Sequence, residues 1–365
     1  MYMKQYFFSI TIIVFLFLSC SKTKQGNLPE IPIDTHQNSS LQLSEITEKI
    51  TKIELELTDE SIIGSNIRGI ILSENEVFIA TLNKILVFNK NGKFIRSIGS
   101  QGKGPGEYTY IHNLALAEKN KLIFISSADR KIVSFDFDGN FLKERQLPEL
   151  FIDDINYVNN ELFIIADKTD RDSTGVYSHS ALYRLNDDFQ ITDSCTIRNL
   201  NFKGTSQISI LGPQDNLLKE NKTFLLYYGD VFLRDDKSAE SVLLDTLYRV
   251  ENIHLVPELK LQFENEQIGK FIHLTTLYRS SRYVFGRYLN TKEPMKEYPF
   301  CYDTKTGKLY NMKDGYTDDI NHIEEKVFIR PFNLNTEMFY YLHTNMKPED
   351  KEEPNPTLYI GKLKK

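Results

Sequence analysis

The chain has 365 residues, of which 41% are hydrophobic and 26% charged, a composition typical of a globular protein with one large domain or two small ones. A formal charge of −6 argues against a nucleic-acid surface, which needs clustered lysine and arginine to neutralise phosphates. With 24 Phe and 20 Tyr but no Trp, the composition favours pleated β-structure.

The N-terminus has the pattern of a bacterial lipoprotein signal. Lys4 precedes an apolar run, residues 6–19, which is shorter than the roughly 20 residues that cross a bilayer but long enough for a signal-peptide core. Cys20 follows at once, and this arrangement resembles the lipobox, in which the peptide is cleaved before a cysteine that is then diacylated; Phe17 departs from the usual leucine or valine. We expect a signal peptide at 1–19 and lipidation of Cys20, with an ordinary secretory signal or an uncleaved anchor as the alternative.

The next segment is polar. Residues 20–44 contain few large apolar side chains, so we expect a flexible tether between the membrane and the domain. Cationic residues follow Cys20 without an acidic run, which favours a periplasm-facing lipid anchor in the cell envelope over the cell surface. Cys195 and Cys301 lie far apart in a large domain, and we expect two separate thiols.

Internal repetition is the clearest signal in the chain. Residues 85–98 and 132–145 align at an offset of 47, which superimposes an Asn-Gly on an Asp-Gly dipeptide. These dipeptides supply the positive φ angles of tight hairpins. A third copy, residues 181–194, is aligned at an offset of 48, which sets Asp187 in place of the turn glycine and Phe189 under a strand phenylalanine. Each copy is predicted to be a hairpin.

Another pair of strands precedes each hairpin, at residues 67–80, 111–126 and 155–166. Each unit therefore holds four short strands. Four strands that recur about every 40 to 48 residues are typical of β-propeller blades, because one such sheet cannot bury both faces until its neighbours stack on it.

Less regular units complete the predicted ring, at residues 205–263, 273–315 and 318–363. Residues 50–57 alternate between polar and apolar, and we expect them to add the last strand of the sixth blade and so close the ring. The sequence thus predicts an all-β, six-bladed propeller of four-stranded antiparallel blades over residues 45–365. A pair of β-sandwiches is the competing architecture, which the even repeat spacing disfavours.

A glycine-rich motif after the first blade carries a family resemblance. Gly99 is followed by Gly102, Gly104, Pro105, Gly106, Glu107 and Tyr108. This stretch resembles the GxGPGEY motif of the six-bladed β-propeller lipoproteins of gut anaerobes, distant relatives of NHL-repeat propellers. Residues 245–250, 255–263 and 318–322 resemble later segments of that family. The resemblance, from about residue 45 to the C-terminus, implies the propeller fold, an envelope location and a binding role, and it transfers no catalytic residues.

The same motif does not fit a nucleotide loop. In a Walker comparison Ser97 takes the place of the first glycine and Gly104 that of the hydroxyl residue. A dinucleotide fingerprint needs GxGxxG before a helix, whereas here a proline intervenes and a strand follows. We predict a blade-to-blade crossover in which glycines permit sharp backbone angles and Tyr108 packs between neighbouring sheets.

Motifs for metal binding or for nucleophilic catalysis have little support in the sequence. The seven histidines include no HxH or HExxH pair, so a metal ion would need ligands that converge from several blades. The acidic residues at 167–175 lack EF-hand spacing, and no GxSxG elbow occurs. We therefore assign no catalytic residue, no metal site and no cofactor.

A ligand is expected at the mouth of the central channel, because the innermost strand of each propeller blade lines it. Polar residues at the starts of the predicted inner strands are the candidate channel-lining residues: Arg68, His112, Asp154 and Asn156. The competing interpretation is that they only satisfy buried strand ends and ordered water.

Two classes of function remain open at this point. The leading hypothesis is a monomeric, membrane-tethered binding or scaffold module with a glycan, peptide or protein ligand. The alternative is a propeller hydrolase or lyase, lactonase-like, with a metal-assisted site at the channel; this rests on fold analogy alone.

Overall fold

The computed structural model describes residues 28–64, 66–173, 175–203, 208–210, 217–229, 231–233, 245–264, 268, 271–290, 292, 296–346 and 354–365. The predicted signal peptide at 1–19 and Cys20 lie outside these residues. Within the described ranges, no helix has both the length and the apolar character needed to cross a bilayer.

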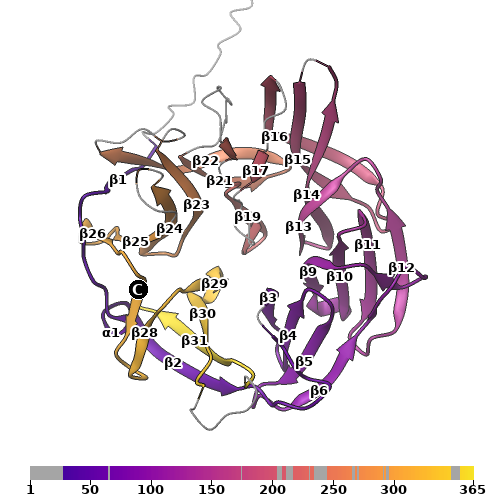
Figure 1. Cartoon of the computed structure of the whole chain (residues 1–365), viewed down its shortest axis with the longest axis horizontal. Helices are drawn as coiled ribbons and strands as arrows, with labels where there is room; N and C mark the ends of the chain where they lie inside the picture. The colour runs from indigo at the N-terminus through magenta and orange to yellow at the C-terminus, as the bar shows by residue number, and fades with distance from the viewer. Residues whose placement is uncertain are drawn as a thin grey trace, which may run out of the picture.

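The described residues form six four-stranded antiparallel blades around a central opening, which confirms the predicted propeller (Figure 1). Blade 1 consists of β3 (Ile67–Leu72), β4 (Glu76–Thr81), β5 (Ile85–Asn89) and β6 (Phe94–Ile98). Blade 2 consists of β9 (Ile111–Ala117), β10 (Leu122–Ser127), β11 (Lys131–Asp136) and β12 (Phe141–Gln146). Blade 3 consists of β13 (Phe151–Val158), β14 (Glu161–Arg171), β15 (Gly175–Leu185) and β16 (Ile191–Lys203).

The other three blades follow the same order from the centre outward. Blade 4 consists of β18 (Leu217–Glu220), β19 (Thr223–Leu226), β21 (Thr246–Glu251) and β22 (His254–Glu264). Blade 5 consists of β23 (Ile272–Arg279), β24 (Tyr283–Asn290), β25 (Glu297–Asp303) and β26 (Lys308–Asn311). Blade 6 consists of β29 (Arg330–Asn333), β30 (Met338–His343), β31 (Thr357–Leu363) and β2 (Thr47–Glu54).

Small elements connect the blades. The parallel pair β7 (Ser100–Gln101) and β8 (Glu107–Tyr108) lies between blades 1 and 2, and β17 (Ile208–Ile210) pairs with β20 (Val231–Leu233). The hairpin of β27 (Tyr316–Asp318) and β28 (Ile323–Val327) precedes blade 6, although we had counted this segment within its strands. The helical elements are α1 (Leu43–Ile46) and the single turns η1 (Glu118–Asn120) and η2 (Leu334–Thr336).

The hydrophobic core lies between neighbouring blades. The middle strands are buried along almost their whole length, as in Val77 to Thr81 of β4, because a blade is covered on both faces. One cluster joins Phe78 of blade 1 to Leu114 of blade 2 through Tyr108. The continuous apolar runs that we assigned to strands therefore follow from two-sided burial.

The ring is closed by pairing of the two ends of the domain. β2 pairs antiparallel with β31, with Ile53 opposite Leu358, and it is the outermost strand of blade 6. This confirms the predicted closure by an N-terminal strand, which begins and ends three residues earlier than the 50–57 segment.

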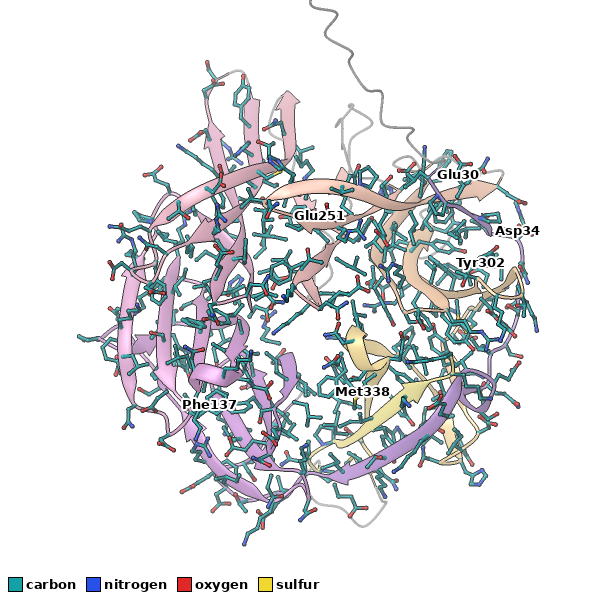
Figure 2. The ribbon with its side chains drawn as sticks, turned by 180° about the vertical axis from the view of Figure 1, so that it is seen from behind. Glu30, Asp34, Phe137, Glu251, Tyr302 and Met338 are labelled. Carbon is teal, nitrogen blue, oxygen red and sulfur yellow. The ribbon has the colours of Figure 1, made fainter. Side chains whose placement is uncertain are left out.

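The segment before β2 differs from the flexible tether predicted for residues 20–44. Its described part, residues 28–44, includes β1 (Glu30–Asp34), which pairs in parallel with β22 and makes a fifth strand on blade 4. Ile33 and Leu41 are fully buried. Two alternating isoleucines in five residues are enough to bury one face of an edge strand, although the segment as a whole is polar. Figure 2 shows Glu30 and Asp34 on the outer rim of the disc.

The third hairpin has a different register from the one predicted. The left-handed turn residues are Gly92 (φ 84°), Gly139 (φ 94°) and Phe189 (φ 57°), so Phe189, and not Asp187, takes the place of the turn glycine. The pairs that close the three turns are Phe88–Phe94, Phe135–Phe141 and Leu185–Ile191. Asp187 was a reasonable prediction because short polar residues tolerate positive φ better than aromatic ones.

Candidate functional site

A cavity of about 370 Å³ occupies the centre of the ring. Its walls come from β3, β9 and the start of η1, β13, β18, and the segment from β29 into η2. Among the described residues, β23 of blade 5 contributes none of the lining. Five blades thus share one central cavity, which is the usual place for a ligand in such a fold.

The inner strands of four blades carry a β-bulge at equivalent positions. In blades 1, 2, 3 and 5 the pairing shifts by one residue near the start of the inner strand, and the residues left unpaired are Arg68, His112, Asp153 and Thr275. A bulge re-aims its side chain and is common at barrel rims and active sites. Arg68, His112 and Asp153 directly precede the lining residues Gly69, Asn113 and Asp154, so they lie at one end of the cavity. We call these three residues the mouth residues. In blade 3 the equivalent of Arg68 and His112 is therefore Asp153, where we had matched Asp154.

Two of the predicted residues, Arg68 and His112, lie at this mouth and are half-buried. They are not among the residues that line the cavity itself. The ring of His112 packs edge-on against Phe151, with 4.9 Å between ring centroids. Burial, and then the charge of Arg68, lowers the pKa of His112, so its imidazole is neutral at neutral pH.

The other two predicted residues line the cavity and also join neighbouring blades. The carboxylate of Asp154 accepts hydrogen bonds from Asn113 Nδ2 at 2.6 Å, from the Ile155 N–H at 2.7 Å and from the Leu217 N–H at 2.9 Å. Asn156 Nδ2 donates to the Leu217 carbonyl at 2.9 Å. These contacts connect β9, β13 and β18, which is the structural role that we had named as the competing interpretation.

A buried cluster beside Asp153 had no signal in the sequence. Tyr228 Oη lies 2.5 Å from Asp153 Oδ2 and 3.1 Å from Asp167 Oδ1, and the guanidinium of Arg198 stacks 4.5 Å from the centre of the Tyr228 ring. Arg198 Nη1 donates to the carbonyl of Gly229 at 3.0 Å. The residues come from β13, β14, β16 and the segment after β19, so only the fold brings them together.

The two carboxyl groups of the cluster hold a proton more tightly than ordinary aspartates do. A tyrosine hydroxyl has one hydrogen and can donate it to only one of two carboxylates. Burial, and then the charge of Asp167, raises the pKa of Asp153 to about 7, and burial raises the pKa of Asp167. Two carboxylates this close share a proton because both cannot be charged in a buried site.

The glycine-rich crossover encloses its own carboxylate. Glu107 Oε2 accepts the Gly104 N–H at 2.7 Å, and a Cβ atom on Gly102 would lie 2.0 Å from the same oxygen. Gly106 has φ 74° and donates its N–H to Glu144 Oε2 at 2.8 Å. The amide donors that a phosphate would need are therefore bound to internal carboxylates.

Tyr108 fixes the crossover to blade 1. Its side chain is fully buried, and its hydroxyl donates to the Ile98 carbonyl at 3.1 Å. Lys131 Nζ, from blade 2, donates to the Glu107 carbonyl at 2.6 Å. The structure places the stretch from Gly102 to Tyr108 between β6 and β9.

A family model described as a domain of unknown function, DUF4934, matches residues 28–365. The chain belongs to the DUF4934 family. No curated protein matches the sequence. Among solved structures, this DUF4934 chain is similar to a Bacteroides fragilis protein thought to be exported, with 18% identity, coverage of 92% of this chain and 100% of that one, and a TM-score of 0.65. A Bacteroides caccae protein of unknown function shares 11% identity, with coverage of 76% and 86% and a TM-score of 0.38.

The DUF4934 match begins at residue 28 and so includes β1, in agreement with its place on blade 4. In the part of the chain that the structure describes, no three His, Cys, Asp or Glu side chains gather at one place. Cys195 and Cys301 are both free thiols.

Proposed function

We propose that this DUF4934 protein is a binding module of the cell envelope, whose ligand enters the central cavity past the mouth residues. The observation that carries the proposal is the set of equivalent bulges, which place Arg68, His112 and Asp153 of three blades directly before residues that line a 370 Å³ cavity. Convergent polar groups over a concave wall are the usual arrangement of a ligand site.

The frame behind the mouth is fixed. Asp154 and Asn156 bind the inner strands of blades 2, 3 and 4 to one another, so His112 and Asp153 stand on strands that cannot shift independently. A preorganised site loses less entropy on binding than a flexible one, which supports binding as the role of this end of the ring.

The N-terminal sequence supports the proposed location in the cell envelope. The lipobox-like Cys20 supports acylation and a periplasm-facing anchor, and a protein of similar fold is thought to be exported. Cys20→Ser is expected to move the protein from the membrane fraction to the soluble fraction and to abolish its labelling with a fatty-acid probe. A Cys20→Ser protein that stays in the membrane after a salt wash would contradict the anchor.

The binding role is tested by a thermal-shift screen of the mature chain carrying Cys20→Ser against saccharides and short peptides. Lys219 is exposed and borders the cavity, so Lys219→Trp narrows it; Lys222→Trp on the same hairpin is the matched control, because Lys222 is exposed but does not line the cavity. A ligand of the cavity is expected to stabilise the parent and the Lys222 variant but not the Lys219 variant. Equal stabilisation of all three would place binding elsewhere and overturn the proposal.

A further inference from the structure

One arginine at the mouth differs from its counterparts in the ring. Four half-buried arginines each contact a carboxylate within 3.0 Å: Arg96, Arg279, Arg282 and Arg287. Arg68 is also half-buried, but among the described residues no acid lies within ion-pair distance of it and its buried Nε has no hydrogen-bond partner. An unpaired donor in a buried position costs free energy, so this arginine is a place where a missing acceptor is expected.

None of the described side chains around Arg68 forms an ion pair with its guanidinium. His112 is neutral because burial and Arg68 lower its pKa, so it offers ring nitrogens for hydrogen bonds without a second charge. Phe151, 40% exposed, flanks His112 with its ring. The third mouth residue, Asp153, is bound to the Tyr228 hydroxyl and makes no ion pair with Arg68. The rest of the mouth of blades 1 to 3 combines a cation, a neutral polar ring and an exposed apolar ring.

The geometry of the guanidinium indicates which kind of acceptor group would bind Arg68. Its planar donors match a carboxylate or phosphate in a bidentate pair, which is stronger when partly shielded from water. The cavity wall also carries the acids Glu118 and Asp154, and the chain is acidic overall, which disfavours a doubly charged phosphate. A group with a single negative charge fits one arginine.

We propose that Arg68 receives the carboxylate of the ligand, and that Phe151 packs against a ring or apolar group attached to it. This inference rests on the proposed function, since it assigns the class of ligand for the same cavity. It makes Arg68 a specificity-determining residue, and it makes the ligand an organic acid with one carboxylate, either an acidic sugar or an aromatic amino-acid derivative.

The test uses matched pairs of probes that differ in the carboxylate. Glucuronate is compared with glucose, and N-acetylphenylalanine with its amide, by calorimetric titration of the mature Cys20→Ser chain at millimolar probe concentrations. We expect at least one carboxylate to bind roughly tenfold more tightly than its neutral partner. The pair that shows this difference identifies the source of the carboxylate.

Variants show which cationic residue causes the preference for a carboxylate over its neutral partner. Arg68→Gln is expected to remove the preference for a carboxylate, and Arg68→Lys to retain part of it because the charge stays while the planar fork of donors is lost. Arg145→Gln, on the outermost strand of blade 2, is expected to leave the preference unchanged. Lys219→Gln tests the other cation at the cavity. Melting curves of each variant confirm that it is folded.

Three results would overturn the inference: a carboxylate preference that survives Arg68→Gln, one that disappears in Lys219→Gln instead, or no carboxylate that binds more tightly than its neutral partner. The proposed function is tested separately from the role of Arg68. If neutral and acidic probes bind equally well and Lys219→Trp abolishes both, the cavity is a binding site and only the role of Arg68 is wrong.

Discussion

The raised pKa of one buried carboxyl group, Asp153, makes the stability of this protein sensitive to pH. The ordinary pKa of an aspartate is 3.8, whereas the pKa of Asp153 is raised to about 7 by burial and by Asp167. Between these values the folded chain holds a proton that the unfolded chain has released. The free energy of unfolding therefore falls as pH rises through this window, by up to about 1.4 kcal/mol per pH unit for one group.

Asp153→Asn removes the titrating group while keeping an acceptor for Tyr228. We expect its melting temperature to fall less than that of the parent between about pH 4 and about pH 8, since the asparagine stays neutral throughout. Arg198 and Asp167 stay in place and Asp167 still titrates, so the slope is reduced rather than abolished. Asp138→Asn, in an exposed turn, is the control and should follow the parent. Parallel curves for the parent and Asp153→Asn would contradict the shared proton.

Phe189 combines a strained backbone with a buried ring. Its φ of 57° costs about 1 kcal/mol or more in a residue other than glycine, while its ring packs edge-on against Phe124 and its side chain is 1% exposed. Loss of a buried phenylalanine costs about 3–5 kcal/mol. Burial therefore outweighs strain.

Because position 189 has a positive φ, we expect the glycine variant to be more stable than the alanine variant, the reverse of the order usual for these two residues. Phe189→Ala is expected to lose about 3–5 kcal/mol of unfolding free energy, and Phe189→Gly roughly 1 kcal/mol less, because glycine loses the ring but also relieves the strain. Urea unfolding of both variants measures the difference. A glycine variant less stable than the alanine variant would show that the position is not strained. Gly139→Ala, at the equivalent turn, should be destabilised by the strain alone.

At the scale of elements, the crossover between β6 and β9 depends on the close approach of the Gly102 backbone to the side chain of Glu107. Gly102→Ala puts a Cβ atom 2.0 Å from Glu107 Oε2, so the carboxylate must shift and give up its hydrogen bond from the Gly104 N–H, at a cost of roughly 1 kcal/mol. In a Glu107→Ala background the obstacle is gone, so the same substitution should cost little. A double-mutant cycle measures this coupling, expected at roughly 1 kcal/mol or more. Additive effects would contradict the contact, and Gly104→Ala, whose Cβ would lie 3.0 Å from the same oxygen, should give an intermediate value.

The elements also show how far sequence reasoning reaches. Four-strand repeats and Asn-Gly or Asp-Gly turns were enough to predict the blades, because two-sided burial and left-handed turns leave strong local signals. The Phe189 turn left none, since its conformation is imposed by ring burial from another blade. At the site, a bulge adds one residue and moves the following side chains to the other face. The bulges show only in the strand pairing, so the sequence could not reveal that Asp153, and not Asp154, is the equivalent of His112. The partners of Asp153 come from β14 and from the segment after β19, which lie far from it in the sequence.

At the scale of the whole molecule, the ring depends on the strand contributed by the N-terminal end. β2 covers the outer edge of β31, whereas β1 only adds to an already complete blade 4. A chain that starts at residue 36 should therefore remain a closed ring with a lower melting temperature. A chain that starts at residue 56 lacks β2, so it should expose the β31 edge and associate. Size-exclusion chromatography and thermal melting separate the two, and identical behaviour would contradict closure by β2.

The N-terminal segment crosses three blades from outside. After β1, Asn311 of β26 donates its side-chain N–H to the Asp34 carbonyl at 3.0 Å, and the Ser44 N–H then donates to Asp319 near blade 6. A mechanical pull on the chain before residue 28 would thus load the β1–β22 ladder first and the β26 contacts second. β2 would bear force only after both had detached. The contacts of residues 28–44 would therefore break before the strand that closes the ring, so the six blades would be insulated from tension on the N-terminal end of the chain.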